Sequence, residues 1–142
     1  MKQRIQLIGY LGRDPEMRYT PSGKAITTIS LAVGERYTNR AGERIEKTAW
    51  FNVLFWDKLA EIANTYLHKG ALIEVWGKLI FDEKTGRPRV YERKDGTLGV
   101  GFEVEAQQML MLKVERKNAP SASASDSVTD IVFDDESEGL PV

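Results

Sequence analysis

The sequence contains no cysteine and a single histidine, His68, among its 142 residues. Without thiols there can be no disulfide, thiolate metal site or cysteine nucleophile, and one imidazole leaves little for a zinc site or a catalytic triad. No apolar run approaches the roughly 20 residues needed to span a bilayer, and no signal-peptide core follows Met1. We therefore expect a soluble, cytoplasmic protein without metal, cofactor or membrane association, and with little capacity for enzyme chemistry.

Basic residues are absent from the C-terminal end of the chain. All 20 Lys and Arg residues lie between Lys2 and Lys117 together with 15 of the 21 acidic residues, which gives this part a net charge of +5. Residues 119–142 hold the other six acids, and Ala119 to Ser127 is a low-complexity stretch with too little apolar surface to offset the entropy of ordering. We expect a basic domain over residues 1–118, suited to a polyanionic partner, and a disordered acidic tail over residues 119–142.

Within residues 1–118 the dominant hydrophobic period is two, which is typical of strands with one buried face. The pattern predicts strands over residues 4–11, 25–33, 48–56 and 71–81, a hairpin of residues 89–93 and 98–105 around Lys94-Asp95-Gly96, and a last strand or strand extension over residues 107–114. One helix is predicted from Asp57, as its N-cap, to Lys69-Gly70. This all-β order with one helix between the third and fourth strands is that of an OB-fold, a five-stranded Greek-key barrel.

Two tryptophans share one face of the strand predicted over residues 48–56. Phe51, Val53 and Phe55 alternate with Trp50, Asn52, Leu54 and Trp56, so the indoles stand outside if the first set fills the barrel. Large apolar rings are costly there without a ligand, and each could contribute about 1 to 3 kcal/mol by stacking on an unpaired nucleobase. The alternatives are that a tryptophan packs beneath a loop or that the inside face is the other one.

The connection from Glu35 to Arg44 carries one aromatic residue and three arginines in a polar, glycine-containing segment. Its composition fits two interpretations equally: a flexible finger that folds over a nucleic-acid strand, or a solvated hairpin loop with paired charges.

Several short motifs lie at a joint spacing that is more specific than any one of them. They are GYLGRDPEMRYTPSGKA at residues 9–25, TAWF at 48–51, KLAE at 58–61 and YLHKG at 66–70. Over most of residues 1–112 they resemble the bacterial-type single-stranded DNA-binding protein family. The resemblance implies a non-enzymatic homotetramer that binds and protects single-stranded DNA without sequence preference in replication, recombination and repair, near the nucleoid.

The resemblance also implies roles for individual residues. The stacking aromatics correspond to Trp50, Trp56 and Tyr37; a further family tryptophan has no aromatic match at Lys84, so Phe81 or Tyr91 becomes the candidate. Phosphate contacts fall on Arg18, Arg40, Lys58 and Lys69, with weaker additions at Arg4, Arg36, Lys47, Arg87 and Arg89. Trp76 is assigned to a subunit interface.

The C-terminal tip is similar to the family's tip, which docks replication and repair proteins. The implied partner-binding residues are Asp134, Asp135, Glu136, Leu140, Pro141 and Val142. The family usually ends in an aromatic residue after proline, where this chain has the smaller Val142. Less apolar area is therefore available for insertion into a partner, and Phe133 is a candidate internal anchor.

Two other functions are compatible with parts of the sequence. An OB-fold protein for structured RNA or tRNA would favour RNA through contacts to the 2′-OH. A carboxylate-metal nuclease would use Asp57, Glu61 or Glu74, but these acids are better explained as a helix cap, a helix surface and a strand exterior.

Overall fold

The computed structural model describes residues 1–114. Its elements, in chain order, are β1 (Ile5–Leu11), β2 (Glu16–Tyr19), β3 (Ala25–Thr38), β4 (Arg44–Trp56), α1 (Asp57–Tyr66), β5 (Leu72–Leu79), β6 (Val90–Glu92), β7 (Leu98–Val100) and β8 (Phe102–Lys113). No helix among these residues has the length and apolar character needed to cross a membrane. The predicted boundary at Asn118 and the acidic segment over residues 119–142 lie outside the described residues.

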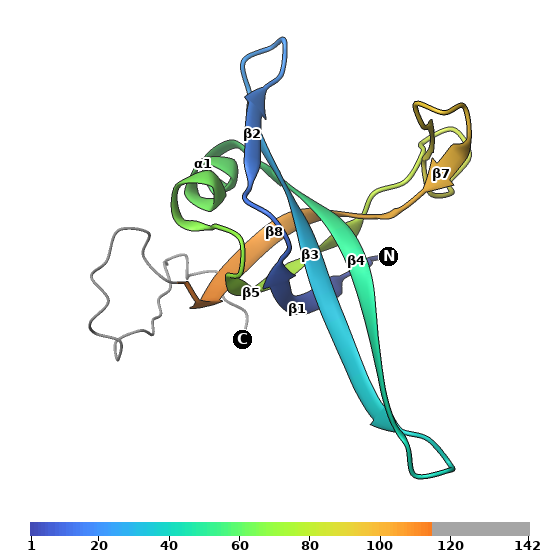
Figure 1. The fold of residues 1–142 in the computed structure, drawn as a ribbon. Coiled ribbons are helices and arrows are strands. Elements are labelled where there is room, and N and C mark those ends of the chain that lie inside the picture. Colours follow the sequence, from blue (N-terminus) through green and yellow to red (C-terminus); the bar gives the residue numbers. More distant parts are fainter. Residues whose placement is uncertain (115–142) are drawn as a thin grey trace.

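The main sheet closes on itself as a barrel (Figure 1). Its strand order is β1-β5-β8-β4-β3-β2, and β1 also pairs with β3. This pairing closes a ring of β1, β5, β8, β4 and β3, with β2 paired to β3 outside the ring. The β4–β8 pair is parallel and the other pairs of this sheet are antiparallel. Closure gives each of the five strands of the ring a partner on both sides over part of its length, which leaves fewer free edges at which other chains could pair. The predicted OB-fold barrel is confirmed, with α1 between its third and fourth strands.

The barrel interior is built from the alternate residues that the period of two predicted. Val53 and Phe55 of β4 are fully buried, as are Ile29 and Leu31 of β3. Phe51 has the same parity but is only partly buried; at one end of the barrel its ring stacks on Phe102, with 5.1 Å between centroids.

A buried hydrogen bond ties the helix to the barrel. The hydroxyl of Thr27 on β3 donates to the carbonyl oxygen of Ala60 on α1 at 2.7 Å. Because the hydroxyl is fully buried, this bond removes the desolvation cost of the polar group and sets the position of α1 relative to β3.

Two glycines permit the close strand approaches that closure requires. A β-carbon at Gly9 would lie 2.2 Å from the carbonyl oxygen of Ala32, and one at Gly77 would lie 2.1 Å from that of Glu105. Gly9 lies where β1 passes from β5 to β3, and Gly77 lies at a register shift in the β5–β8 ladder. In both places a strand backbone, rather than a side chain, occupies the space of the missing methyl group.

The predicted ends of α1 are wrong at both termini. The N-cap is Trp56, without a side-chain capping hydrogen bond, and Asp57 is the first helical residue with a φ of +56°. Aspartate tolerates this left-handed conformation better than most residues, which lets β4 turn into α1 without a loop. The helix ends at Tyr66, whereas Gly70 lies in the following turn, where its N–H donates to the carbonyl oxygen of Leu11.

Strands β3 and β4 continue beyond the barrel as a long two-stranded ribbon (Figure 1). Pairing runs without interruption from Ile26 opposite Trp56 to Thr38 opposite Arg44, so the predicted strand limits at Val33 and Thr48 are too short. The turn is closed by the carboxamide oxygen of Asn39, which accepts the N–H groups of Ala41 and Glu43. The segment is a hydrogen-bonded hairpin, as the second interpretation expected, and whether it folds over a nucleic-acid strand stays a prediction.

Candidate nucleic-acid interface

The outer face of β3 and β4 carries Trp50. Trp50 is 54% exposed, as the strand parity predicted, and it lies opposite Ala32 on β3, which in turn lies opposite Tyr10 on β1. The face around the indole is therefore formed by one small residue and one exposed aromatic residue. An exposed indole on a rigid sheet can offer a flat surface to an unpaired base.

Trp56 lies on the same outer face but is less exposed. It is opposite Ile26 on β3, and Ile26 is opposite Arg18 on β2. Ile26 is only 4% exposed although it is not part of the barrel core, so Trp56 and Arg18 flank and shelter it on the outside. Trp56 thus combines a packing role with partial availability for stacking.

The predicted phosphate ligands divide into two groups. Arg18 on β2 lies two strands from Trp56, across Ile26, and Lys58 lies two residues after Trp56 in the first turn of α1. Within residues 1–114 neither side chain forms an ion pair. Arg40 lies in the turn of the β3–β4 ribbon, and Lys69 follows α1, where its backbone N–H donates to Asp14 at 2.8 Å. Arg18 and Lys58 thus lie on elements near the end of β4 that carries Trp56, whereas Arg40 and Lys69 lie elsewhere.

Tyr37 lies in the ribbon, away from Trp50. The uninterrupted β3–β4 register gives Tyr37 the opposite parity from Ala32, so it projects from the other face of the two strands. Its ring is exposed, and the ammonium of Lys47 lies 5.6 Å from the ring centroid. Tyr37 could therefore stack only on nucleic acid that passes around the ribbon.

Of the two candidates for the missing family tryptophan, Tyr91 has a cation over its ring, and Phe81 has no cation or aromatic ring against it within residues 1–114. Both Phe81 and Tyr91 are exposed in the connection between β5 and β8. The guanidinium of Arg93 lies 5.6 Å from the centroid of Tyr91, and both side chains pack over Gly99. One face of Tyr91 is thus occupied, which favours Phe81.

Two of the weaker phosphate candidates are already paired with carboxylates. Arg89 donates two hydrogen bonds to Glu103, at 2.8 and 2.9 Å, and this contact raises the pKa of Arg89 above its ordinary value. Arg36 lies 3.4 Å from Glu46 across the ribbon. Because their charge is partly neutralised, these arginines are weaker phosphate ligands than Arg18 and Lys58.

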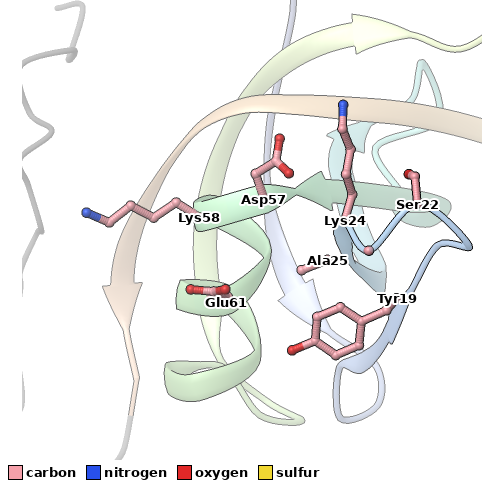
Figure 2. A pocket seen from close by; sticks show the side chains of 8 residues that line it. Tyr19, Ser22, Lys24, Ala25, Asp57, Lys58 and Glu61 are labelled. Atoms are coloured by element: carbon pink, nitrogen blue, oxygen red, sulfur yellow. The ribbon is translucent and has the colours of Figure 1, made fainter.

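A pocket of about 360 Å³ lies between the β2–β3 turn and the start of α1 (Figure 2). Tyr19, which the sequence analysis did not single out, contributes an exposed ring to it. The cations Lys24 and Lys58 are balanced by Asp57 and Glu61, so the charged lining is formally neutral. A neutral lining does not favour phosphate binding in this pocket.

The acids considered for metal chemistry are distributed over different elements. Asp57 and Glu61 belong to α1, whereas Glu74 lies on β5 and accepts a hydrogen bond from Gln6 of β1. Residues 1–114 contain no group of three or more His, Asp or Glu side chains arranged to hold a metal ion.

Within residues 1–114 the barrel is closed, has one parallel strand pair and a helix before its fourth strand, and bears Trp50 and Arg18 on its outer face. These features define a nucleic-acid-binding type of OB-fold protein. Residues 2–112 match the single-strand binding protein family, and the chain belongs to this family, whose members are DNA-binding proteins rather than enzymes. The resemblance noted in the sequence is thereby confirmed.

Individual relatives agree with this assignment. The single-stranded DNA-binding proteins of two strains of Neisseria meningitidis, serogroups A and B, are 40% identical over 119 residues, which is 84% of this chain and 64% of theirs. That of Xanthomonas campestris pv. campestris is 39% identical over 109 residues, which is 77% of this chain and 59% of the relative. The chain thus spans less than two thirds of the length of these relatives.

Solved structures show the same fold. The SSB of Plasmodium falciparum, in complex with single-stranded DNA, has a TM-score of 0.66 at 24% identity and covers 79% of this chain and 96% of its own. A deletion mutant of the single-stranded DNA-binding protein of Thermus aquaticus has a TM-score of 0.60 at 29% identity, covering 81% of this chain and 51% of its own.

Proposed function

We propose that this protein binds single-stranded DNA without sequence preference and protects it during replication, recombination and repair. The observation that carries the proposal is Trp50, an indole more than half exposed on the outer face of the barrel. Membership of the single-strand binding protein family supports the choice of single-stranded DNA over other ligands. We also propose that the protein acts in the cytoplasm, at the nucleoid.

The arrangement of side chains explains how single-stranded DNA would bind without preference for its base sequence. Bases stack on Trp50 and on the exposed part of Trp56, and every base offers a π-face for this contact. Arg18 and Lys58 hold the phosphates beside Trp56, which gives affinity without base readout. Tyr37 and Arg40 on the ribbon, together with Lys69 and Phe81, extend the path of the strand around the barrel.

Tryptophan fluorescence provides the direct test. Adding oligo-dT is expected to quench emission in a saturable way, because stacking brings a base against an indole. Oligo-U titrated at the same salt concentration separates the proposed function from the RNA alternative, since tighter binding of oligo-U would favour an RNA ligand. Saturable binding of neither oligonucleotide would contradict the proposal.

A homotetramer is part of the proposal, and the outer face of β1, β5 and β8 is the surface proposed for it. Ile8 and Tyr10 of β1 are exposed there, and the register places them beside Glu74 and Leu72 of β5, with Trp76 further along the same face. An exposed sheet face that carries several apolar side chains is suited to symmetric association.

Multi-angle light scattering is expected to give four times the mass of the 16.0 kDa chain. The substitution Trp76→Glu should lower the mass, because a carboxylate would be buried in the interface without a partner. Glu61→Gln on the exposed surface of α1 is the control, for which the fourfold mass should persist. A monomeric wild-type protein, or a Trp76→Glu variant that remains tetrameric, would contradict the proposed interface.

Recruitment of replication and repair proteins is proposed for the acidic end of the chain, at Asp134, Asp135, Glu136, Leu140, Pro141 and Val142. The supporting features are the six acids of residues 119–142 and the apolar residues that follow them. Charge would attract a basic partner and the apolar terminus would insert into it. Val142 offers less area than an aromatic residue, so we expect modest partner affinity.

Truncation after Asn118 is expected to leave oligo-dT affinity unchanged or slightly higher at low salt, because a competing anionic segment has been removed. Fluorescence titration of the truncated and full-length proteins measures the change. A full-length variant with Asp134→Asn, Asp135→Asn and Glu136→Gln separates charge from length, and should reproduce part of any gain. A large loss of DNA affinity on truncation would show that the segment contributes to DNA binding instead.

A further inference from the structure

Backbone conformation does not explain why the residue that follows the end of β1, Gly12, is a glycine. Five other glycines adopt a positive φ, which glycine tolerates best; they are Gly23, Gly42, Gly70, Gly86 and Gly96. Gly12 is not among them, and unlike Gly9 and Gly77 it is not opposed at short distance by a strand backbone.

What occupies the space above Gly12 is the indole of Trp50. A β-carbon at Gly12 would lie 2.6 Å from Cζ3 and 2.9 Å from Cη2 of Trp50, while its nearest backbone neighbour, the carbonyl oxygen of Ser30, is 3.8 Å away. Carbon atoms in contact normally lie about 3.5 to 4.0 Å apart, so a methyl group at Gly12 and the present indole position are incompatible.

The sheet order explains how two distant residues meet. β3 lies between β4 and β1, so the Trp50 side chain crosses β3 to reach the end of β1. The outward residues of β3 at this crossing are Ser30 and Ala32, both small. Gly12 is held in place because its N–H donates to the carbonyl oxygen of Ser30 at 2.9 Å. A conflict at Gly12 would therefore be relieved by movement of the indole rather than of the backbone.

We infer that Gly12 is a positioning residue for DNA binding: its missing side chain provides the seat on which the Trp50 indole rests across β3, in an orientation that leaves more than half of the side chain open for a base. This inference rests on the proposed function, since it assigns the seat to the stacking platform. Gly12 itself touches no DNA and acts through Trp50.

The test uses a protein in which Trp50 is the sole tryptophan, made by Trp56→Phe and Trp76→Phe, since the chain contains three tryptophans. In this background Gly12→Ala is expected to change acrylamide quenching of Trp50 without DNA, because the ring is displaced. Gly12→Ala should also weaken oligo-dT binding about fivefold to tenfold. This loss lies in the lower part of the range of affinity losses expected when one stacked base is lost. Gly34→Ala is the matched control, because a β-carbon at Gly34 meets no atom closer than 3.9 Å.

A double-mutant cycle shows whether the effect passes through the indole. Trp50→Phe removes the atoms Cζ3 and Cη2, so Gly12→Ala added to Trp50→Phe should change the oligo-dT Kd less than twofold, measured by fluorescence anisotropy of labelled oligo-dT. An equal loss in both backgrounds, misfolding in both, or no loss with Trp50 present would overturn the inference. Failure of the parent protein to bind oligo-dT would instead contradict the proposed function, and the acrylamide measurement would still report on the seat.

Discussion

Trp50→Ala is expected to weaken oligo-dT binding about 5- to 150-fold at constant salt, which corresponds to the roughly 1 to 3 kcal/mol of one stacked base. The indole is the most exposed tryptophan of the outer barrel face and lies on the rigid β3–β4 ladder. Little ordering is therefore required before a base can stack on it. Fluorescence anisotropy of labelled oligo-dT measures the loss independently of the deleted fluorophore.

Two companion variants make this result specific. Trp50→Phe should retain much of the affinity, since a π-face remains. Trp56→Ala should weaken binding less than Trp50→Ala but lower the free energy of unfolding, because Ile26 loses part of its cover. If Trp50→Ala and Trp56→Ala both bind oligo-dT like the wild-type protein, the stacking platform is located elsewhere.

Oligo-dT affinity is expected to fall steeply with salt, because each phosphate neutralised on a single strand contributes a slope of about −0.7 in log K against log salt. The four proposed phosphate ligands, Arg18, Arg40, Lys58 and Lys69, then give a slope of about −2.8 per protomer, or roughly a 600-fold loss for a tenfold rise in salt. Titrations over a series of NaCl concentrations measure this slope.

Removing the two cations beside Trp56 should reduce the dependence on salt. Arg18→Ala combined with Lys58→Ala is expected to make the slope shallower by about 1.4, since two phosphate contacts are lost. Lys94→Ala, at the turn between β6 and β7, is the control and should leave the slope unchanged. A slope that is flat in the wild-type protein, or unaffected by the double substitution, would contradict a phosphate role for these residues.

Much of the barrel could be predicted because its signals are local. The alternation of Phe51, Val53 and Phe55 with Trp50 and Trp56 depends only on the geometry of one strand, and it correctly separated buried from outward residues at Val53, Phe55 and Trp50. The errors in the predicted strand limits also have a local cause. Charged residues between Glu35 and Lys47 obscure the alternation of the ribbon, so the cross-strand pairing that extends β3 and β4 was missed.

The candidate interface was predictable in its members but less so in its arrangement. Strand parity placed Trp50 outside the barrel. It did not reveal that Ile26 lies between Arg18 and Trp56 on the outer face, or that Arg89 is hydrogen-bonded to Glu103. These neighbours come from separate strands, and a sequence without contact information does not specify which strands pair. The motif that contains Gly12 contributed to recognition of the family, but nothing in it pointed to Trp50.

Residue patterns within short segments determine the helix that follows β4, the division of charge between the two ends of the chain and the outward direction of Trp50, because periodicity and composition need no partner. They did not reveal β2 or the division of residues 98–105 between β7 and β8. The shelter of Ile26 and the seat of Trp50 on Gly12 arise only when β1, β3 and β4 lie side by side in the closed barrel. Barrel closure brings the end of β1 within reach of an indole two strands away, and contacts of this kind depend on pairing over long distances in the chain.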